Sequence, residues 1–221
     1  MKKIPLEYNQ SSKTKKKILI LGKNSTLSKE LYTLIKKDNF DIERTTKKEI
    51  NFKSDNYRTK LKKKFLSFNP DIIINFIGKF NLNEKATKDL LILNTLPTWE
   101  ILKIFLHKKI KKKTNLLIIG SSSFDSPRKK YMLYAASKSA LNSLIGSAIE
   151  YFSDTKMSIK IFNPSTFGGK HIDGFNKKIN IDANKVAKDI YRYIKKQIKL
   201  NLLKWKKKHL LQELQDKMEA I

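Results

Sequence analysis

The sequence predicts an α/β protein with one Rossmann-like, doubly wound parallel sheet and helices on both of its faces. Short runs rich in Ile and Leu alternate with longer helical patterns along most of the 221 residues, and this alternation is typical of βαβ units. Five of the seven glycines lie in the turns that follow the apolar runs, where a backbone must turn tightly or approach a ligand. The carboxyl ends of parallel strands meet at one edge of a sheet, so these turns are expected to lie together.

The expected elements follow one another in βα order. Strands are predicted at 18–21, 40–44, 49–52, 72–75, 115–119 and 158–162. Helices are predicted at 29–37, 56–68, 86–106, 133–152 and 183–195. Residues 16–199 should form a single domain, preceded by a flexible basic tail at 1–15. Residues 200–221 are expected to form a basic, amphipathic C-terminal helix, which could contact an anionic membrane surface.

Composition excludes several classes of site. The chain has no cysteine and three scattered histidines, so disulfides, thiol catalysis and a metal site are not expected. There is no apolar stretch long enough to span a membrane and no signal-like N-terminus, so a cytoplasmic protein is predicted.

The formal charge of +28 allows two interpretations. It can mark a surface for nucleic acid or anionic lipid. The lysines are spread over the whole chain, and aromatic residues are not interleaved with them. Compositional bias is therefore favoured, and nucleic-acid binding is kept as the weaker alternative.

The strand at 115–119 and the helix after it carry the candidate chemistry. The strand ends in Gly120 and three serines, and the helix carries Tyr134 and Lys138. Residues four apart share one face of a helix, and an ammonium beside a phenol favours the phenolate. Tyr134 would then exchange protons nearer neutral pH. A serine hydroxyl, that of Ser121 or of Ser122 if the strand ends one residue later, would hold a carbonyl oxygen against the phenol.

Ser121, Tyr134 and Lys138 resemble the Ser…Tyr-x-x-x-Lys signature of the short-chain dehydrogenase/reductase family. This resemblance covers roughly residues 16–195. It implies an NAD(P)-dependent oxidoreductase that reduces a carbonyl or oxidises an alcohol, with a small-molecule substrate and a homo-oligomeric assembly.

The family resemblance also implies a role for each catalytic residue. Tyr134 would be the general acid, and Ser121 would position the substrate oxygen. Lys138 would lower the pKa of the tyrosine and bind the nicotinamide ribose. Asn94, within the helix at 86–106, corresponds to the family asparagine and would hold a water that relays protons to Lys138.

The cofactor site implied by the resemblance follows the strand ends. Its residues are Gly22, Asn24, Ser25, Thr26, Leu27, Lys47, Asn75, Gly78, Tyr134, Lys138, Pro164 and Thr166. Of the three glycines in the family's pyrophosphate loop, only Gly22 is kept, because Thr26 and Ser28 take the other two positions. Their hydroxyls could bind phosphate, but a Cβ there hinders close approach of the pyrophosphate.

Two finer expectations concern cofactor and substrate. Thr46 and Lys47 after the second strand favour NADP, with NAD as the alternative. The stretch 17–78 resembles nucleotide-sugar reductases such as dTDP-4-dehydrorhamnose reductases, so a nucleotide-linked sugar is one expected substrate. The incomplete glycine loop motivates an alternative, a catalytically silent protein of the same fold that senses a cofactor or acts as a scaffold.

Overall fold

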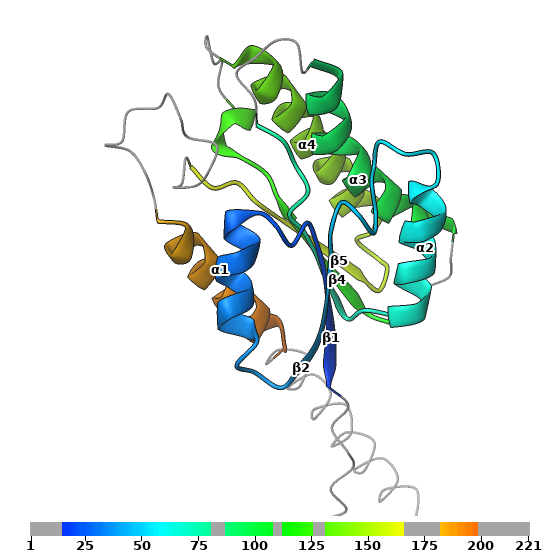
Figure 1. Cartoon of the computed structure of the whole chain (residues 1–221), viewed down its shortest axis with the longest axis vertical. Helices are drawn as coiled ribbons and strands as arrows, with labels where there is room; N and C mark the ends of the chain where they lie inside the picture. The colour runs from blue at the N-terminus through cyan, green and yellow to red at the C-terminus, as the bar shows by residue number, and fades with distance from the viewer. Residues whose placement is uncertain (1–14, 81–86, 108–111, 126–130, 166–181, 199–221) are drawn as a thin grey trace, which may run out of the picture.

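The computed structural model describes residues 15–80, 87–107, 112–125, 131–165 and 182–198 (Figure 1). Within them, five parallel strands form one sheet in the order β2-β1-β3-β4-β5. Helices cover both faces of this sheet (Figure 1), so the predicted Rossmann-like, doubly wound architecture is confirmed. Most of the expected N-terminal tail and the expected C-terminal helix lie outside the described residues.

The strands end level with one another at the edge that carries the polar turns. They comprise β1 (Lys16–Leu21), β2 (Phe40–Thr45), β3 (Ile72–Asn75), β4 (Thr114–Ile119) and β5 (Met157–Phe162). The register pairs Leu21 with Asn75, Asn75 with Ile118, and Ile119 with Phe162. The chain reverses direction across the sheet between β1 and β3, and such a switch point is where doubly wound sheets bind ligands.

Alternating side chains along the strands divide the core into two layers. Ile18, Ile20 and Ile74 face α1 (Thr26–Ile35) and a helix over residues 183–198. Leu19 and Ile73 face the opposite layer, because successive strand residues point to opposite faces. That layer consists of α2 (Tyr57–Phe68), α3 (Thr87–His107) and α4 (Met132–Tyr151).

Helix α1 begins three residues before its predicted start at 29. Ser25 is the N-cap, and its hydroxyl accepts a hydrogen bond from the backbone N–H of Ser28 at 3.1 Å. A serine N-cap satisfies one of the free amides of the first turn. Thr26 and Ser28 therefore belong to the first turn of α1 and not to a loop.

The strand predicted at 49–52 is wrong. The carboxylate of Glu49 accepts hydrogen bonds from the backbone N–H and the hydroxyl of Thr46, at 2.7 and 2.9 Å. The backbone N–H of Ile50 in turn bonds to the carbonyl of Thr46. These local bonds form turns in place of a ladder, while Ile50 and Phe52 are still buried in the core.

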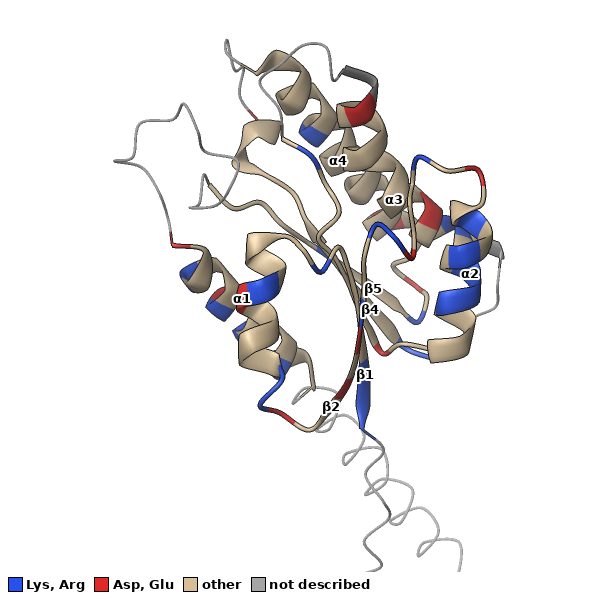
Figure 2. Cartoon of the chain, viewed as in Figure 1, with Lys and Arg blue, Asp and Glu red and all other residues tan. Residues whose placement is uncertain are grey.

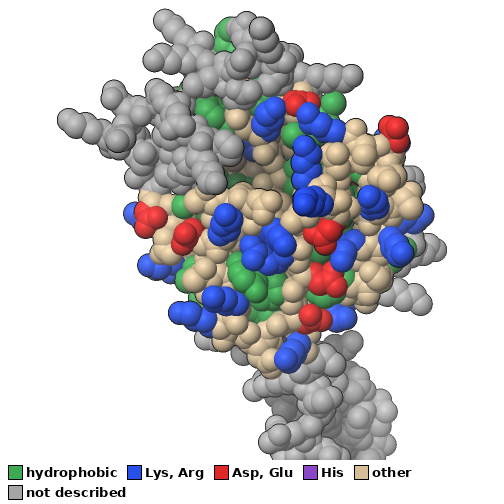
Figure 3. Space-filling view, in the orientation of Figure 1, with side chains coloured by type: hydrophobic (Ala, Val, Ile, Leu, Met, Phe, Trp, Pro, Cys, Tyr) green, Lys and Arg blue, Asp and Glu red, His purple; other side chains and the backbone are tan. Residues whose placement is uncertain are grey.

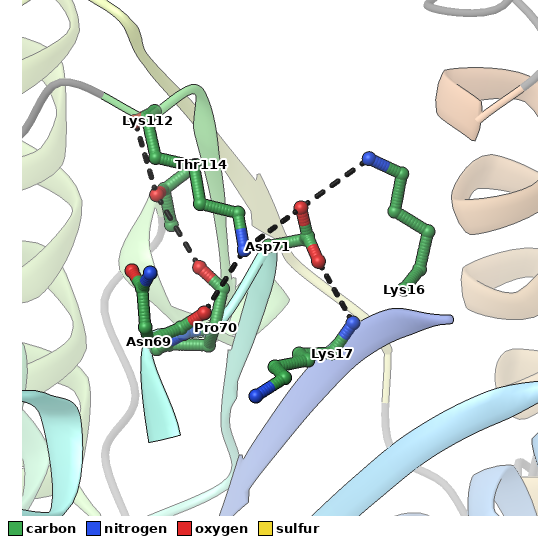
Figure 4. A network of polar contacts seen from close by, with 7 residues as sticks. All are labelled: Lys16, Lys17, Asn69, Pro70, Asp71, Lys112 and Thr114. Atoms are coloured by element: carbon green, nitrogen blue, oxygen red, sulfur yellow. Dashed lines mark hydrogen bonds and ion pairs between the residues drawn. The ribbon is translucent and has the colours of Figure 1, made fainter. Parts of the chain in front are cut away.

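The opposite edge of the sheet, where the strands begin, is held together by the buried carboxylate of Asp71 (Figure 4). One of its oxygens accepts the backbone N–H of Lys17 at 2.8 Å. The other oxygen pairs with the ammonium groups of Lys16 at 3.3 Å and Lys112 at 3.1 Å. Asp71 thus joins the starts of β1, β3 and β4 without touching the opposite edge.

We predict that Asp71→Ala lowers the free energy of unfolding by about 2 kcal/mol, because it leaves the partly buried N–H of Lys17 unpaired and two lysines without their counter-charge. Urea unfolding followed by circular dichroism measures the change. Asp41→Ala, at a partly exposed position on β2, is the matched control and should have little effect. Equal losses in the two variants would contradict this role for Asp71.

Candidate functional site

Tyr134 and Ser121 meet at the carboxyl edge of the sheet. Tyr134 lies in the first turn of α4, and its hydroxyl lies near the side chain of Ser121, which favours the phenolate form. Ser121 lies two residues after β4 and caps the short 3-10 helix η2 (Ser122–Phe124), where its hydroxyl also accepts the N–H of Ser123 at 3.2 Å. The folded chain therefore brings the predicted phenol and serine hydroxyl together.

Lys138 lies one turn further along α4 and is buried. Its ammonium donates to the carbonyl oxygen of Ile119 at 3.3 Å and lies 5.8 Å from the centre of the Tyr134 ring. A Cβ at Gly78 would stand 3.6 Å from the ammonium, so the glycine brings bare backbone up to the lysine. No carboxylate in the described part of the chain pairs with Lys138. Burial lowers the pKa of Lys138 from 10.5 to about 8.

Tyr134 is shielded from water by two other aromatic rings. Phe80 meets the Tyr134 ring edge-on, with ring centres 4.7 Å apart, and Tyr131 lies at 6.2 Å. Burial raises the pKa of Tyr134, Tyr131 adds to the rise, and the hydrogen bond from Ser121 opposes it. The sequence led us to expect a pKa lowered by Lys138. In the free protein the pKa of Tyr134 shifts the other way, because desolvation outweighs the other contributions.

Asn94 lies on α3 and fixes the turn after β3. Its side-chain oxygen accepts the N–H of Lys79 at 2.7 Å, and its amide nitrogen donates to the Lys79 carbonyl at 3.0 Å. The same nitrogen donates to the hydroxyl of Ser137 on α4 at 2.8 Å. The side chain thus positions the turn, and the expected proton relay through water stays a prediction.

Asn75 also has a structural set of contacts. It is buried at the end of β3, where its amide donates to Thr98 on α3 at 3.0 Å. Its side-chain oxygen accepts the N–H of Ile77 at 3.0 Å. These bonds shape the turn that presents Gly78 to Lys138.

The loop after β1 has the form of an anion site. Gly22 has a φ of +86°, and a Cβ there would approach the backbone of Phe76 and Ile77 to 3.2 Å, so a larger residue would be strained. Among the described residues, the N–H groups of Thr26 and Leu27 have no hydrogen-bond partner. Free amides at a helix N-terminus attract phosphate.

Two other side chains at the start of α1 are turned inward. Leu27 packs in the core between α1 and the sheet, so only its backbone is available at the loop. Ser28 is fully buried, and its hydroxyl finds no partner in the described ranges. Phosphate therefore cannot reach the Ser28 hydroxyl, and this small residue instead allows close packing of the helix on the strand.

Basic residues surround the end of β2 and the loop beside it. Asn24 in the loop and Lys47 after β2 are both exposed. Sequence reasoning missed Arg44, whose guanidinium stacks on Tyr32 at 3.9 Å and donates to the carbonyl of Lys23 at 3.0 Å. The scarcity of arginine in a lysine-rich chain was a signal that could have identified it.

The turn after β5 completes the edge. The carbonyl of Pro164 accepts the N–H of Ser122 at 3.0 Å, so the predicted residue lies beside the serine run. Thr166 lies outside the described residues. Asn163 was not predicted as a site residue, yet its side chain bonds to both Ser121 and Asn142. Nothing in the sequence distinguishes Asn163 from the chain's many other asparagines.

Other classes of site find little support in the described residues. They contain no group of His, Asp and Glu side chains able to hold a metal ion. No helix among them is both long and apolar enough to cross a membrane. Helix α2 is the most basic element (Figure 2), but acidic side chains lie among the basic ones on the surface seen in Figure 3. Charge alone therefore defines no nucleic-acid surface.

The fold resembles those of solved short-chain dehydrogenases. The TM-score is 0.69 at 10% identity for a Burkholderia cenocepacia short-chain dehydrogenase in complex with NADP, covering 79% of this chain and 81% of the other. For a short-chain dehydrogenase from Streptomyces avermitilis the TM-score is 0.70 at 13% identity, covering 82% of this chain and 84% of the other. For a Pseudomonas 3-alpha-hydroxysteroid dehydrogenase complexed with NADH the TM-score is 0.63 at 13% identity, covering 80% of this chain and 87% of the other.

No protein-family model and no curated protein sequence matches the chain. At these identities the structural likeness shows that the chain has the fold of short-chain dehydrogenases. The finer resemblance to dTDP-4-dehydrorhamnose reductases is not supported by the structural neighbours.

We predict that Lys138→Met stabilises the protein at neutral pH, because it removes a buried charge that pairs with no carboxylate in the described ranges. The shift in pKa from 10.5 to about 8 corresponds to a penalty on the order of 3 kcal/mol. Between these two pH values the unfolded chain binds more protons at this residue than the folded chain, so the penalty is full below pH 8 and fades as the pH approaches 10.5.

Thermal unfolding at pH 7 and at pH 10 compares the two proteins. The gain in melting temperature should be largest at pH 7 and should shrink at pH 10. The exposed Lys62→Met on α2 is the matched control and should show neither effect. A Lys138→Met variant less stable than the parent at pH 7 would show that the buried ammonium does not destabilise the folded protein.

Proposed function

We propose that the chain is an NAD(P)-dependent oxidoreductase of the short-chain dehydrogenase/reductase type, which interconverts a carbonyl and an alcohol. The observation that carries this proposal is the approach of the Tyr134 and Ser121 side chains beside a buried lysine that pairs with no carboxylate of the described residues. A buried cation that destabilises the fold is typical of a functional site. The common fold with dehydrogenases bound to NADP or NADH supports the same class.

The residues at this edge fit a nicotinamide dinucleotide. Gly22 keeps the loop close to β3, and the free amides of Thr26 and Leu27 would bind the pyrophosphate. Gly78 has no side chain to block the approach to the Lys138 ammonium, and this ammonium would bind ribose hydroxyls. When bound, the dinucleotide supplies the hydride.

In carbonyl reduction, Tyr134 donates its phenolic proton to the substrate oxygen. The Ser121 side chain lies near this phenol, so a carbonyl oxygen held by both hydroxyls is placed for the transfer. A phenol with a raised pKa is protonated at neutral pH, which is the form required of a donor. The positive charge of Lys138 then stabilises the phenolate that remains, and an ammonium with a pKa of about 8 is mostly charged at pH 7.

We propose NADP as the cofactor, with NAD as the alternative. Lys23, Arg44 and Lys47 lie around the end of β2, where a basic environment favours a 2′-phosphate. The carboxylate of Glu49 at the Thr46 amide opposes this preference. A nucleotide-linked sugar stays one proposed substrate on the strength of the sequence resemblance alone.

The catalytic proposal is tested by Tyr134→Phe. Consumption of NADPH is measured over a panel of ketones and aldehydes, and kcat/KM is compared on every substrate that is turned over. Loss of the proton donor should lower kcat/KM by about 100-fold or more. Tyr151→Phe, at the exposed end of α4, is the control and should keep full activity. Turnover unchanged in Tyr134→Phe would rule out this mechanism.

A second candidate is a silent protein of the same fold that binds the cofactor as a sensor or scaffold. Two observations favour it: Phe80 and Tyr131 cover the phenol, and Thr26 stands at a glycine position of the loop. Saturable NADPH binding without oxidation by any carbonyl of the panel would support this candidate over the enzyme.

We also propose that two copies pair through α3 and α4. These helices carry the apolar residues Leu91, Trp99 and Ile149, each more than 35% exposed, and a surface that exposes large apolar side chains favours association. Sedimentation velocity should show a dimer that Trp99→Glu converts to monomer, whereas Leu66→Glu on α2 should leave it intact. A monomeric parent protein would refute this assembly.

A further inference from the structure

Asn163 lies at the junction of three elements next to Ser121. It is the first residue after β5, and its side-chain oxygen accepts the backbone N–H of Ser121 at 3.1 Å. Its amide nitrogen donates to the side-chain oxygen of Asn142 on α4 at 3.1 Å. One amide group therefore links the ends of β4 and β5 to the helix that carries Tyr134.

The chemistry of these partners fixes the orientation of the Asn163 amide. The backbone N–H of Ser121 can only donate, so it must face the oxygen of Asn163 and not its nitrogen. The nitrogen then faces Asn142, whose oxygen accepts. A turned amide would place two donors against each other, so the side chain has one favourable arrangement.

Gly120 makes the space that this amide fills. A Cβ at position 120 would lie 1.9 Å from the side-chain oxygen of Asn163, and 2.9 Å from the end of the Ile161 side chain. The first distance is a direct overlap, so any side chain at 120 would expel the Asn163 amide. Gly120 is thus required by the neighbouring side chain and not by its own backbone conformation.

The same strand ends are held by backbone bonds that converge on Ser121. Gly120 donates its N–H to the carbonyl of Phe162 at 2.7 Å, and Ser122 donates to the carbonyl of Pro164 at 3.0 Å. These bonds fix the residues before and after Ser121, and the bond to Asn163 fixes Ser121 itself. The Ser121 hydroxyl reaches Tyr134 from this fixed backbone.

We infer that Asn163 is a positioning residue, which sets the backbone of Ser121 so that its hydroxyl bonds to the Tyr134 phenol. This inference rests on the proposed function for its catalytic meaning, but the geometry it describes exists in the free protein. Asn142 serves as the anchor that holds the Asn163 amide in place.

The first test is a double-mutant cycle on stability between Gly120 and Asn163. Gly120→Ala in the parent protein should lower the melting temperature strongly, because the new methyl overlaps the Asn163 amide. In an Asn163→Ala background the same glycine substitution should cost about half as much or less, since the overlapping atom is gone. Equal costs in the two backgrounds would overturn the claim that Asn163 fills the space at Gly120.

The second test reads the Ser121–Tyr134 bond without requiring turnover. The ¹³Cζ resonance of Tyr134 at neutral pH reports the hydrogen bond of its hydroxyl, and Ser121→Ala gives the shift that results when this bond is lost. Asn163→Ala should move the resonance in the same direction. In the Ser121→Ala background, Asn163→Ala should cause no additional shift of this resonance. The Asn163→Ala single variant should also speed hydrogen exchange of the Ser121 amide by about tenfold or more.

A folded Asn163→Ala protein with an unchanged Tyr134 resonance and unchanged exchange at Ser121 would overturn the inference. If Asn163→Ala does not fold, Asn142→Ala removes only the anchor and should cause a smaller change of the same sign. No effect of Asn142→Ala would then count against the proposal. Failure of the proposed function is distinguishable, because a protein without turnover can still show both changes.

Discussion

Hydrogen bonding between parallel strands determines how far each strand extends toward the edge that carries the site. Leu21 pairs with Asn75, and Ile119 pairs with Phe162, so the turns after β1, β3, β4 and β5 all begin at the same level. A slip of one residue in any pair would move a turn away from its neighbours and would also exchange the two faces of that strand. The buried Ile and Leu residues on both faces prevent such a slip. The packing of the core thus determines the positions of the turns that form the site.

This dependence explains which features the sequence could predict. The alternation of apolar runs with helical patterns was sufficient for the sheet, and the four-residue spacing was sufficient to place Tyr134 and Lys138 on one face of α4. The segment at 49–52 was misassigned because its apolar residues are buried from a turn, whose bonds come from the side chain of Glu49. The role of Asn163 could not be predicted, because it exists only where the ends of two strands and a helix meet.

Lys138 shows the opposing demands of stability and function. Its buried ammonium donates to one backbone carbonyl and pairs with no carboxylate in the part of the chain that the structure describes, and this arrangement costs stability at neutral pH. Nearby, burial against rings such as Phe80 raises the pKa of Tyr134, and electrostatic repulsion from Tyr131 raises it further. The expectation from sequence considered only the lysine and the tyrosine. It missed the Phe80 ring, because Phe80 comes from the turn after β3, far from Tyr134 in the sequence.

The proposed chemistry of Ser121, Tyr134 and Lys138 requires that this edge of the sheet binds a nicotinamide dinucleotide. The most direct measurement is a titration of the purified protein with NADPH and NADH at moderate salt, following the fluorescence of the reduced nicotinamide. We expect saturable binding with a micromolar dissociation constant, tighter for NADPH than for NADH. Absence of saturable binding of either cofactor would contradict the account and would leave the Ser121–Tyr134–Lys138 group as a structural remnant of the fold.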